Sequence, residues 1–370
     1  MLGFSKKTTL LLVLLLLMVG QIKNLFCECK KDFLYLVSVS FLTTTAKAII
    51  VKKRHSSSLL RRASFANWIS GEFGMFYMNI RHNVKKDSSS KNTFHYLTRT
   101  AHFAEQKADE ELEFVRSGNM PAWAVDAPAT FWHSADRYEI ARGRTSSTLT
   151  VALPKELSKQ QRKELVEAFI QEFADQYQFP YTAAVHNHPS ELTGEDQPHL
   201  HLMYSERSLA DGIERPPEQF FKQYRPKNPT KGGAQKLTAD ALGFGRDQVK
   251  AFREKTEQLI NQALEMHAPM KTLILEGMEI VVPNRVSHLS NQEFNQKYGT
   301  QLQDVPQIYR WKLKSADPII QLEVEAQKHT IQQIRQFNKL QIYQKEYNQA
   351  LDQRKNQDLD RDDSYTPSWF

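Results

Sequence analysis

Cysteine is nearly absent from this chain. The sequence of 370 residues contains two cysteines, Cys27 and Cys29, and none after them. From Lys30 onward the protein can therefore form neither a disulfide framework nor a metal site built on thiolates. This cysteine usage fits a reducing compartment, and we expect the protein to be cytoplasmic.

Long apolar runs are also scarce. The run from Leu10 to Val19 follows two lysines, as in a secretory signal, and it is too short for a comfortable membrane span. Residues 1–74 show no clean helical or alternating pattern that would dock on a domain. We therefore interpret them as a signal-like or mis-started segment, with Met75 or Met78 as the natural start.

The charged residues are balanced toward the basic side. The formal net charge is +7 at pH 7 and the pI is about 9.1. Such a balance favours polyanionic partners, including nucleic acid, but it does not define a fold. The length and the hydrophobic fraction of 40% are sufficient for one sizeable core or two modest ones.

From Met75 onward the apolar pattern predicts an α+β domain over residues 75–240, with a mainly antiparallel sheet flanked by helices. Ser158 and Gln161 form a capping box that opens one of these helices. Alternating residues predict strands at 75–84, 147–153, 181–185 and 199–204. The predicted helices lie at 91–115, at 128–140 and after Ser158, and a polar loop covers 188–198.

The rest of the chain is predicted to be mainly helical. We expect residues 241–318 to form a helical extension with a short strand, because apolar residues between Val249 and Leu264 recur at helical spacing. Residues 319–370 combine sparse apolar residues with many glutamines, lysines and glutamates. This composition predicts a polar helix over about 319–355 and a disordered tail after Asp358.

Histidines give the strongest chemical signal. His199 and His201 flank one leucine in the predicted strand PHLHLMYS, so both imidazoles project from the same face. His186 ends the preceding strand and reaches the same face if the two strands pair. Three neutral imidazoles can hold a divalent cation and leave positions open for substrate oxygens. The alternative is that these are ordinary strand histidines; His188, past the strand end, is interpreted as a loop residue.

Several stretches resemble the MobA/MobL family of relaxases. They are HYLTRTAHFAEQKADEELEFVRSGNMPAW, FWHSADRYEIARGR with TVALPKEL, and a segment from Pro180 to Lys236 that includes PHLHLMYSER and DGIERP. The histidine strand with the SER and DGIERP segments is the most specific part, and the resemblance covers about residues 75–290. It implies a relaxase-like domain of the HUH-type nuclease class.

The resemblance also implies which residues act. Tyr96 falls at the family's nucleophile position, and His186, His199 and His201 fall at its three metal ligands. The tyrosine precedes the histidines in the chain, as it does in relaxases.

Two features differ from the family pattern. The family carries acidic residues where this chain has Thr148 and Thr150, so an acidic role there is missing. The histidine loop is also longer here. Tyr138 is a rival to the nucleophile, although it lies outside the nucleophile motif.

By this resemblance the protein is a DNA relaxase, an endonuclease that nicks one strand at a plasmid transfer origin. Tyr96 attacks a phosphate with the help of Mn²⁺ or Mg²⁺, forms a 5′-phosphotyrosine link and later allows rejoining. The implied partners are single-stranded or locally melted origin DNA, accessory mobilisation proteins and a coupling protein, with no small-molecule substrate. Two alternatives stay open: a catalytically inactive DNA-binding relic, and a metal-dependent phosphodiesterase that uses water.

A basic segment follows the histidine strand. It mixes lysine and arginine with proline, glycine and aromatic residues, which predicts a loop that follows phosphates while Phe220, Phe221 and Tyr224 stack on unpaired bases. A solvated loop with tucked aromatic side chains is the alternative. The residues predicted to bind DNA are Arg207, Arg215, Lys222, Arg225, Lys227, Lys231 and Lys236.

Overall fold

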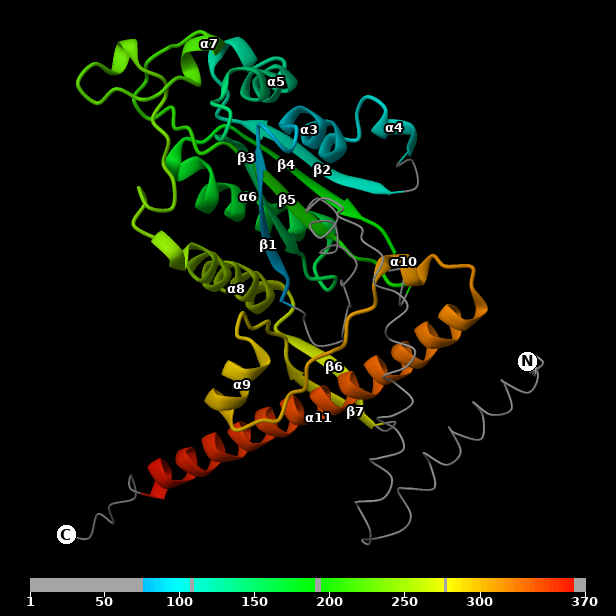
Figure 1. The fold of residues 1–370 in the computed structure, drawn as a ribbon. Coiled ribbons are helices and arrows are strands. Elements are labelled where there is room, and N and C mark those ends of the chain that lie inside the picture. The colour runs from blue at the N-terminus through cyan, green and yellow to red at the C-terminus, as the bar shows by residue number, and fades with distance from the viewer. Residues whose placement is uncertain (1–75, 107–109, 190–193, 276–277, 363–370) are drawn as a thin grey trace, which may run out of the picture. The chain divides into compact units, whose positions relative to one another are not determined.

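The computed structural model describes residues 76–362, except residues 107–109, 190–193 and 276–277. The expectations for residues 1–74 and for the end of the tail lie outside these described residues. Within them the chain is built on a five-stranded antiparallel sheet with helices on both faces (Figure 1). The predicted α+β fold class is therefore confirmed.

The sheet places its most buried strands at its centre. Its strands are β1 (Met78–Val84), β2 (Glu111–Gly118), β3 (Arg144–Ala152), β4 (Tyr181–Asn187) and β5 (His199–Tyr204). Their order is β1-β3-β5-β4-β2, and every neighbouring pair is antiparallel. The three central strands are almost wholly buried, because helices cover both of their faces.

Two apolar layers enclose the sheet. Its helices are α3 (Ser90–Thr98), α4 (Phe103–Gln106), α5 (Pro128–Tyr138), α6 (Lys159–Phe173), α7 (Pro217–Phe220) and α8 (Gln248–His267), with 3-10 turns at Ala122–Ala124, Asp175–Tyr177, Pro229–Lys231 and Gly245–Asp247. On one face α6 and α8 pack on residues such as Leu200. On the other face α3 and α5 pack on residues such as Met203. Because neighbouring strand residues point to opposite faces, the histidines of β5 share the α3 face with Met203.

The helix predicted over residues 91–115 is wrong. α3 ends at Thr98, because Arg99 adopts a left-handed backbone conformation with φ of 53° that stops the helix. The letters ELEF then begin β2, whose register with β4 runs from Glu111 opposite Asn187 to Gly118 opposite Tyr181. That pairing joins segments far apart in the chain, and it decides the conformation more than the local apolar spacing does.

Beyond residue 240 the structure adds a hairpin and further helices. Its additional elements are β6 (Met270–Leu275), β7 (Met278–Pro283), α9 (Asn291–Tyr298), α10 (Arg310–Leu313) and α11 (Pro318–Asp362). The predicted polar helix is present as α11, but it continues past Asp358, where we expected disorder. The single short strand that we expected is a pair of strands. None of the helices in the described part of the chain is both long and apolar enough to cross a membrane.

Candidate active site

Three histidines meet on the face of the sheet that α3 covers. In the pairing of β4 with β5, His186 lies directly opposite His199, and His201 follows on the same face. The three ring centroids lie 5.5, 4.9 and 4.9 Å apart. One ligand atom of each histidine lies within 4.8 Å of the others, and all three side chains are buried. Within the described residues, this is the cluster that could hold a metal ion.

Hydrogen bonds orient two of these rings in the same way. His199 Nδ1 lies 2.8 Å from the Gln197 carbonyl oxygen, and because a carbonyl only accepts, Nδ1 is the donor. His201 Nδ1 lies 3.0 Å from the Thr150 hydroxyl oxygen. Each ring therefore directs Nε2 toward the cluster, the orientation in which it could bind a metal ion. The Thr150 hydroxyl holds His201 without the charge that an acidic residue would bring.

His186 is held the other way round. Its Nε2 donates to the Leu97 carbonyl oxygen over 2.8 Å, so its lone pair is on Nδ1. That Nδ1 accepts a hydrogen bond of 3.1 Å from Arg99 Nη2. Both contacts come from the C-terminal end of α3, so the helix that carries Tyr96 is joined directly to His186.

Burial keeps the imidazoles of His199 and His201 neutral. The pKa of His199 is lowered to about 3, mainly by burial and also by His186 and His188, while the Gln197 carbonyl and Glu110 act in the opposite direction. Burial also lowers the pKa of His201 well below its ordinary value. A neutral imidazole binds a metal without first losing a proton. Together with His186, whose hydrogen bonds also require a neutral ring, they could hold a divalent ion and leave coordination positions for substrate oxygens.

We expect the metal-free protein to lose stability as the pH falls below about 6.5, the ordinary pKa of histidine. Folded His199 and His201 stay neutral, because burial depresses their pKa values, whereas the same side chains take up protons in the unfolded chain. The unfolded state then binds more protons, and stability falls by about 1.4 kcal/mol per pH unit for each histidine. Melting temperatures between pH 7 and pH 5 measure this loss. A flat profile over that range would contradict the assigned charge state.

Tyr96 faces the histidine cluster from α3. Its ring centroid lies 6.0 Å from that of His186 and 6.4 Å from that of His201, with edge-to-face geometry in both contacts. The start of α3 is fixed by Asp136, whose carboxylate accepts a hydrogen bond of 2.8 Å from the Ser90 backbone N–H. The helix therefore presents Tyr96 from a fixed position.

Tyr138 has different contacts, and His188 lies beside the cluster. Tyr138 is on α5, where the Arg137 guanidinium carbon lies 5.2 Å from its ring centroid. The ring of His188 lies 5.2 Å from that of His199 but is not part of the group that could share one metal ion.

Sequence reasoning missed Arg99 and Glu110, and it singled out Thr150 without predicting its contact with His201. Arg99 contacts Tyr96 and His186, and its guanidinium pairs with the Glu110 carboxylate. The one available signal was an arginine three positions after the proposed nucleophile. It was hidden because we placed both residues inside one long helix.

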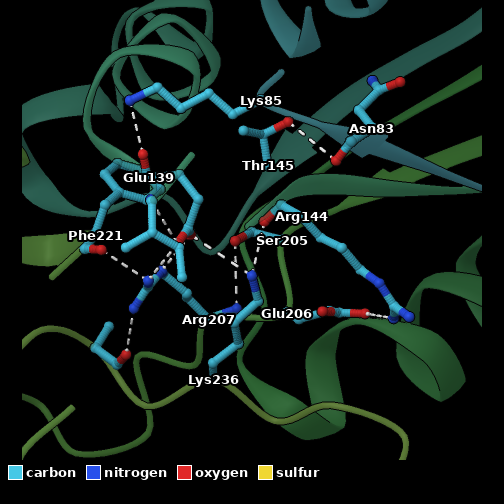
Figure 2. A network of polar contacts seen from close by, with 12 residues as sticks. Asn83, Lys85, Glu139, Arg144, Thr145, Ser205, Glu206, Arg207, Phe221 and Lys236 are labelled. Atoms are coloured by element: carbon cyan, nitrogen blue, oxygen red, sulfur yellow. Dashed lines mark hydrogen bonds and ion pairs between the residues drawn. The ribbon is translucent and has the colours of Figure 1, made fainter. Parts of the chain in front are cut away.

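Arg207, one of the residues predicted to bind DNA, makes its hydrogen bonds inside the protein. Its guanidinium makes two hydrogen bonds of 2.9 Å to the Glu139 carboxylate (Figure 2). It also donates to the carbonyl oxygens of Phe221, Lys222 and Ala234. With 5% of the Arg207 side chain exposed, this network holds the basic segment on the domain.

Arg215 and Lys236 are also used inside the protein. Arg215 is buried, pairs with Asp211 over 2.6 Å and donates to the Gly232 carbonyl oxygen over 3.1 Å. Lys236 is half-buried and donates to the Arg144 carbonyl oxygen over 2.8 Å (Figure 2), and burial lowers its pKa. Of the basic residues predicted to bind DNA, those exposed to solvent are Lys222, Arg225, Lys227 and Lys231.

The aromatic residues of this segment are tucked in. Phe220 and Phe221 are 2% and 1% exposed and pack against Phe131, so they cannot stack on DNA bases. The loop closes tightly over them, since a Cβ on Gly233 would lie 2.0 Å from the Lys222 carbonyl oxygen. The alternative of a solvated loop with tucked aromatics therefore holds for these two phenylalanines.

Fold and site together define an α+β protein with a buried three-histidine centre that could hold a metal, and a tyrosine that faces it. The chain belongs to the MobA/MobL family, whose profile matches residues 87–273. This range includes Tyr96 and the three histidines. The family inferred from the sequence is therefore confirmed.

Relatives and one solved structure extend this finding. The chain is 45% identical over 135 residues to the 43 kDa relaxation protein of Salmonella typhimurium, a match that covers 36% of this chain and 35% of that protein. It is 40% identical over 193 residues to Mobilization protein A of Escherichia coli, covering 50% of this chain and 25% of that protein. The matches thus span about a third of the relaxation protein and a quarter of Mobilization protein A.

A solved structure described as the molecular basis of vancomycin resistance transfer in Staphylococcus aureus is 16% identical. The match covers 58% of this chain and 99% of that one, with a TM-score of 0.39. A likeness this distant has no bearing on function.

Proposed function

We propose that this protein is a DNA relaxase that nicks one strand at a plasmid transfer origin. The placement of Tyr96 carries the proposal, because its ring faces two of three buried histidines. A nucleophile beside a site for a divalent cation is what phosphodiester transesterification needs. Membership of the MobA/MobL family and the names of the relatives, relaxation protein and Mobilization protein A, support it.

The proposed step transfers a phosphate to the tyrosine. His186, His199 and His201 would hold a divalent ion, Mn²⁺ or Mg²⁺, which when bound polarises the scissile phosphate and offsets its developing charge. The phenol oxygen of Tyr96 attacks phosphorus, and the bond from phosphorus to the 3′ oxygen breaks. The phenol loses its proton and the 3′ oxygen gains one, leaving a 5′-phosphotyrosine and a free 3′-hydroxyl. Attack by a 3′-hydroxyl on that link reverses the step and rejoins the strand.

The helix α3 orients the Tyr96 side chain toward the histidine cluster. Phe94 and Leu97 are buried under it, and Asp136 caps its first turn, so the Tyr96 ring has little freedom to leave the cluster. Holding a nucleophile close to its target in advance removes part of the entropic barrier.

A labelled single-stranded oligonucleotide that contains the transfer origin tests this function. Incubation with Mn²⁺ or Mg²⁺ followed by a denaturing gel should show a covalent protein–DNA adduct. Cleavage without an adduct would favour a phosphodiesterase that uses water. DNA binding with neither cleavage nor adduct would favour an inactive relic.

The exposed basic residues are the proposed DNA contact. We expect the variant in which Lys222, Arg225 and Lys227 are all changed to glutamine to bind DNA more weakly, whatever its sequence, because phosphate contacts carry no sequence information. Three lost contacts should reduce the slope of log affinity against log salt by about 2 on single strands. Fluorescence anisotropy at several salt concentrations measures both effects.

A matched control neutralises exposed lysines on the other face of the sheet. Lys163 on α6 and Lys250 on α8 are exposed, and their replacement by glutamine should leave the slope unchanged. Equal slopes for the wild-type protein and the triple variant would place the DNA contact elsewhere.

The proposed function also assigns accessory mobilisation proteins and a coupling protein as partners, in the cytoplasm where plasmid DNA lies.

A further inference from the structure

Arg99 joins the proposed nucleophile to a proposed metal ligand. Its guanidinium carbon lies 4.5 Å from the Tyr96 ring centroid, and Nη1 donates to the Tyr96 carbonyl oxygen over 2.6 Å. Its Nη2 lies 3.1 Å from His186 Nδ1 and also pairs with the Glu110 carboxylate. The side chains of Arg99 and Glu110 are 8% and 19% exposed, so water screens this pair weakly.

The backbone at Arg99 is unusual as well. Its φ of 53° places it in the left-handed region, which residues other than glycine and asparagine rarely adopt. Such conformations are often found at functional sites, where the surrounding contacts hold them in place. Here the conformation ends α3 and turns the guanidinium toward the histidines.

Arg99 occupies the nitrogen that His186 can offer to a metal. Because His186 Nε2 donates to the Leu97 carbonyl oxygen, the lone pair is on Nδ1, and Arg99 Nη2 already donates to it. One lone pair cannot serve a guanidinium and a metal ion at the same time. A metal ion that uses His186 must therefore take the place of the Arg99 hydrogen bond.

The charges of the pair both act on the histidine cluster, with opposite signs. Arg99 Nη2 lies 3.1 Å from His186 Nδ1, so its positive charge adjoins the atom that would bind the cation. The Glu110 carboxylate pairs with this same Nη2 and is 19% exposed, so its negative charge lies next to that of Arg99 with little screening by water. A cation held by these histidines would therefore be repelled by Arg99 and attracted by Glu110.

We propose that the Arg99–Glu110 pair sets the affinity of the three-histidine site for its divalent ion. Arg99 is a positioning residue that occupies His186 Nδ1 until the ion displaces it, and Glu110 retains the freed guanidinium beside Tyr96. The ion thus has to outcompete a resident cation. This inference rests on the metal centre of the proposed function, but not on nicking.

Titration calorimetry of the full chain with Mn²⁺ tests the proposal without any nicking. Arg99→Gln should bind Mn²⁺ more tightly, by about tenfold, because it removes a competing positive charge. Glu110→Gln should bind it more weakly, by about tenfold, because it removes the attracting charge. Arg99→Lys keeps the charge and should stay close to the wild-type affinity. General damage to the site would weaken binding in Arg99→Gln and Glu110→Gln alike.

The pair of Arg162 and Glu113 provides a matched control. The side chains of Arg162 and Glu113 are 8% and 3% exposed, and Arg162 Nη2 lies 2.7 Å from Glu113 Oε1. Arg162 belongs to α6 on the other face of the sheet. Arg162→Gln should leave the Mn²⁺ affinity unchanged, with melting curves confirming that each variant is folded.

The outcomes separate this inference from the proposed function. The proposal is overturned if Arg99→Gln binds Mn²⁺ no more tightly than the wild type. It is also overturned if Glu110→Gln binds Mn²⁺ more tightly, as Arg99→Gln is expected to do. If Arg99→Gln does not fold, the result for Glu110→Gln still decides, since unchanged affinity there also overturns it. A wild-type protein that binds no Mn²⁺ overturns this proposal and the proposed metal centre together, whereas tight wild-type binding with unaltered variants overturns this proposal alone.

Discussion

Replacement of Tyr96 by phenylalanine is expected to abolish the covalent adduct while the protein still folds and binds DNA. The change removes one oxygen and keeps the ring that faces His186 and His201. Packing is therefore preserved, because the shape of the side chain is almost unaltered. Loss of the nucleophile in an enzyme with a covalent intermediate costs on the order of a million-fold in rate. The adduct should consequently disappear from a denaturing gel of the labelled origin oligonucleotide.

Tyr138→Phe is the matched control for this experiment. Tyr138 is also a half-buried tyrosine in the apolar layer that α3 and α5 share, but its contacts are with that layer and with Arg137. Its variant should form the adduct at the wild-type rate. If Tyr96→Phe forms the adduct as fast as the wild type, Tyr96 is not the nucleophile and Tyr138 is the next residue to test. Loss of DNA binding in Tyr96→Phe would instead indicate a packing role.

The features that the sequence predicted correctly depend on short-range patterns. The alternation around Leu200 fixes which face His199 and His201 share, because the strand period of two is a local property. The capping box of Ser158 and Gln161 starts α6 where we predicted it, since both of its hydrogen bonds lie within four residues. The fold class followed from the order of such elements.

The features that the sequence could not predict depend on contacts between distant segments. β2 becomes a strand by pairing with β4, and the side chain of Arg99 meets His186 across 87 positions of the chain. Composition shows the charge of Arg207 but not its partner Glu139, which lies 68 positions earlier. An arginine that is buried and paired with a carboxylate therefore looks the same in the sequence as an exposed arginine that binds phosphate.

His199→Ala and His201→Ala are each expected to lose most of the affinity for a divalent ion, and nicking with it. These two residues share a strand face, and each directs Nε2 toward the cluster through a hydrogen bond at Nδ1. Changes that only loosen a ligand's orientation cost about 10- to 100-fold in metal affinity, so removal of the ligand itself should cost at least about 100-fold.

Two measurements follow this loss, with His188→Ala as the matched control. An ion that binds only the folded protein raises its melting temperature, so Mn²⁺ should stabilise the wild-type protein and His188→Ala but not His199→Ala or His201→Ala. Calorimetric titration with Mn²⁺ should give the same ranking. His188 is near enough to test the choice of ligands, since its ring lies 5.2 Å from that of His199. An equal loss of affinity in His188→Ala would mean that the ion sits closer to the loop and that His188, rather than His186, completes the ligand set.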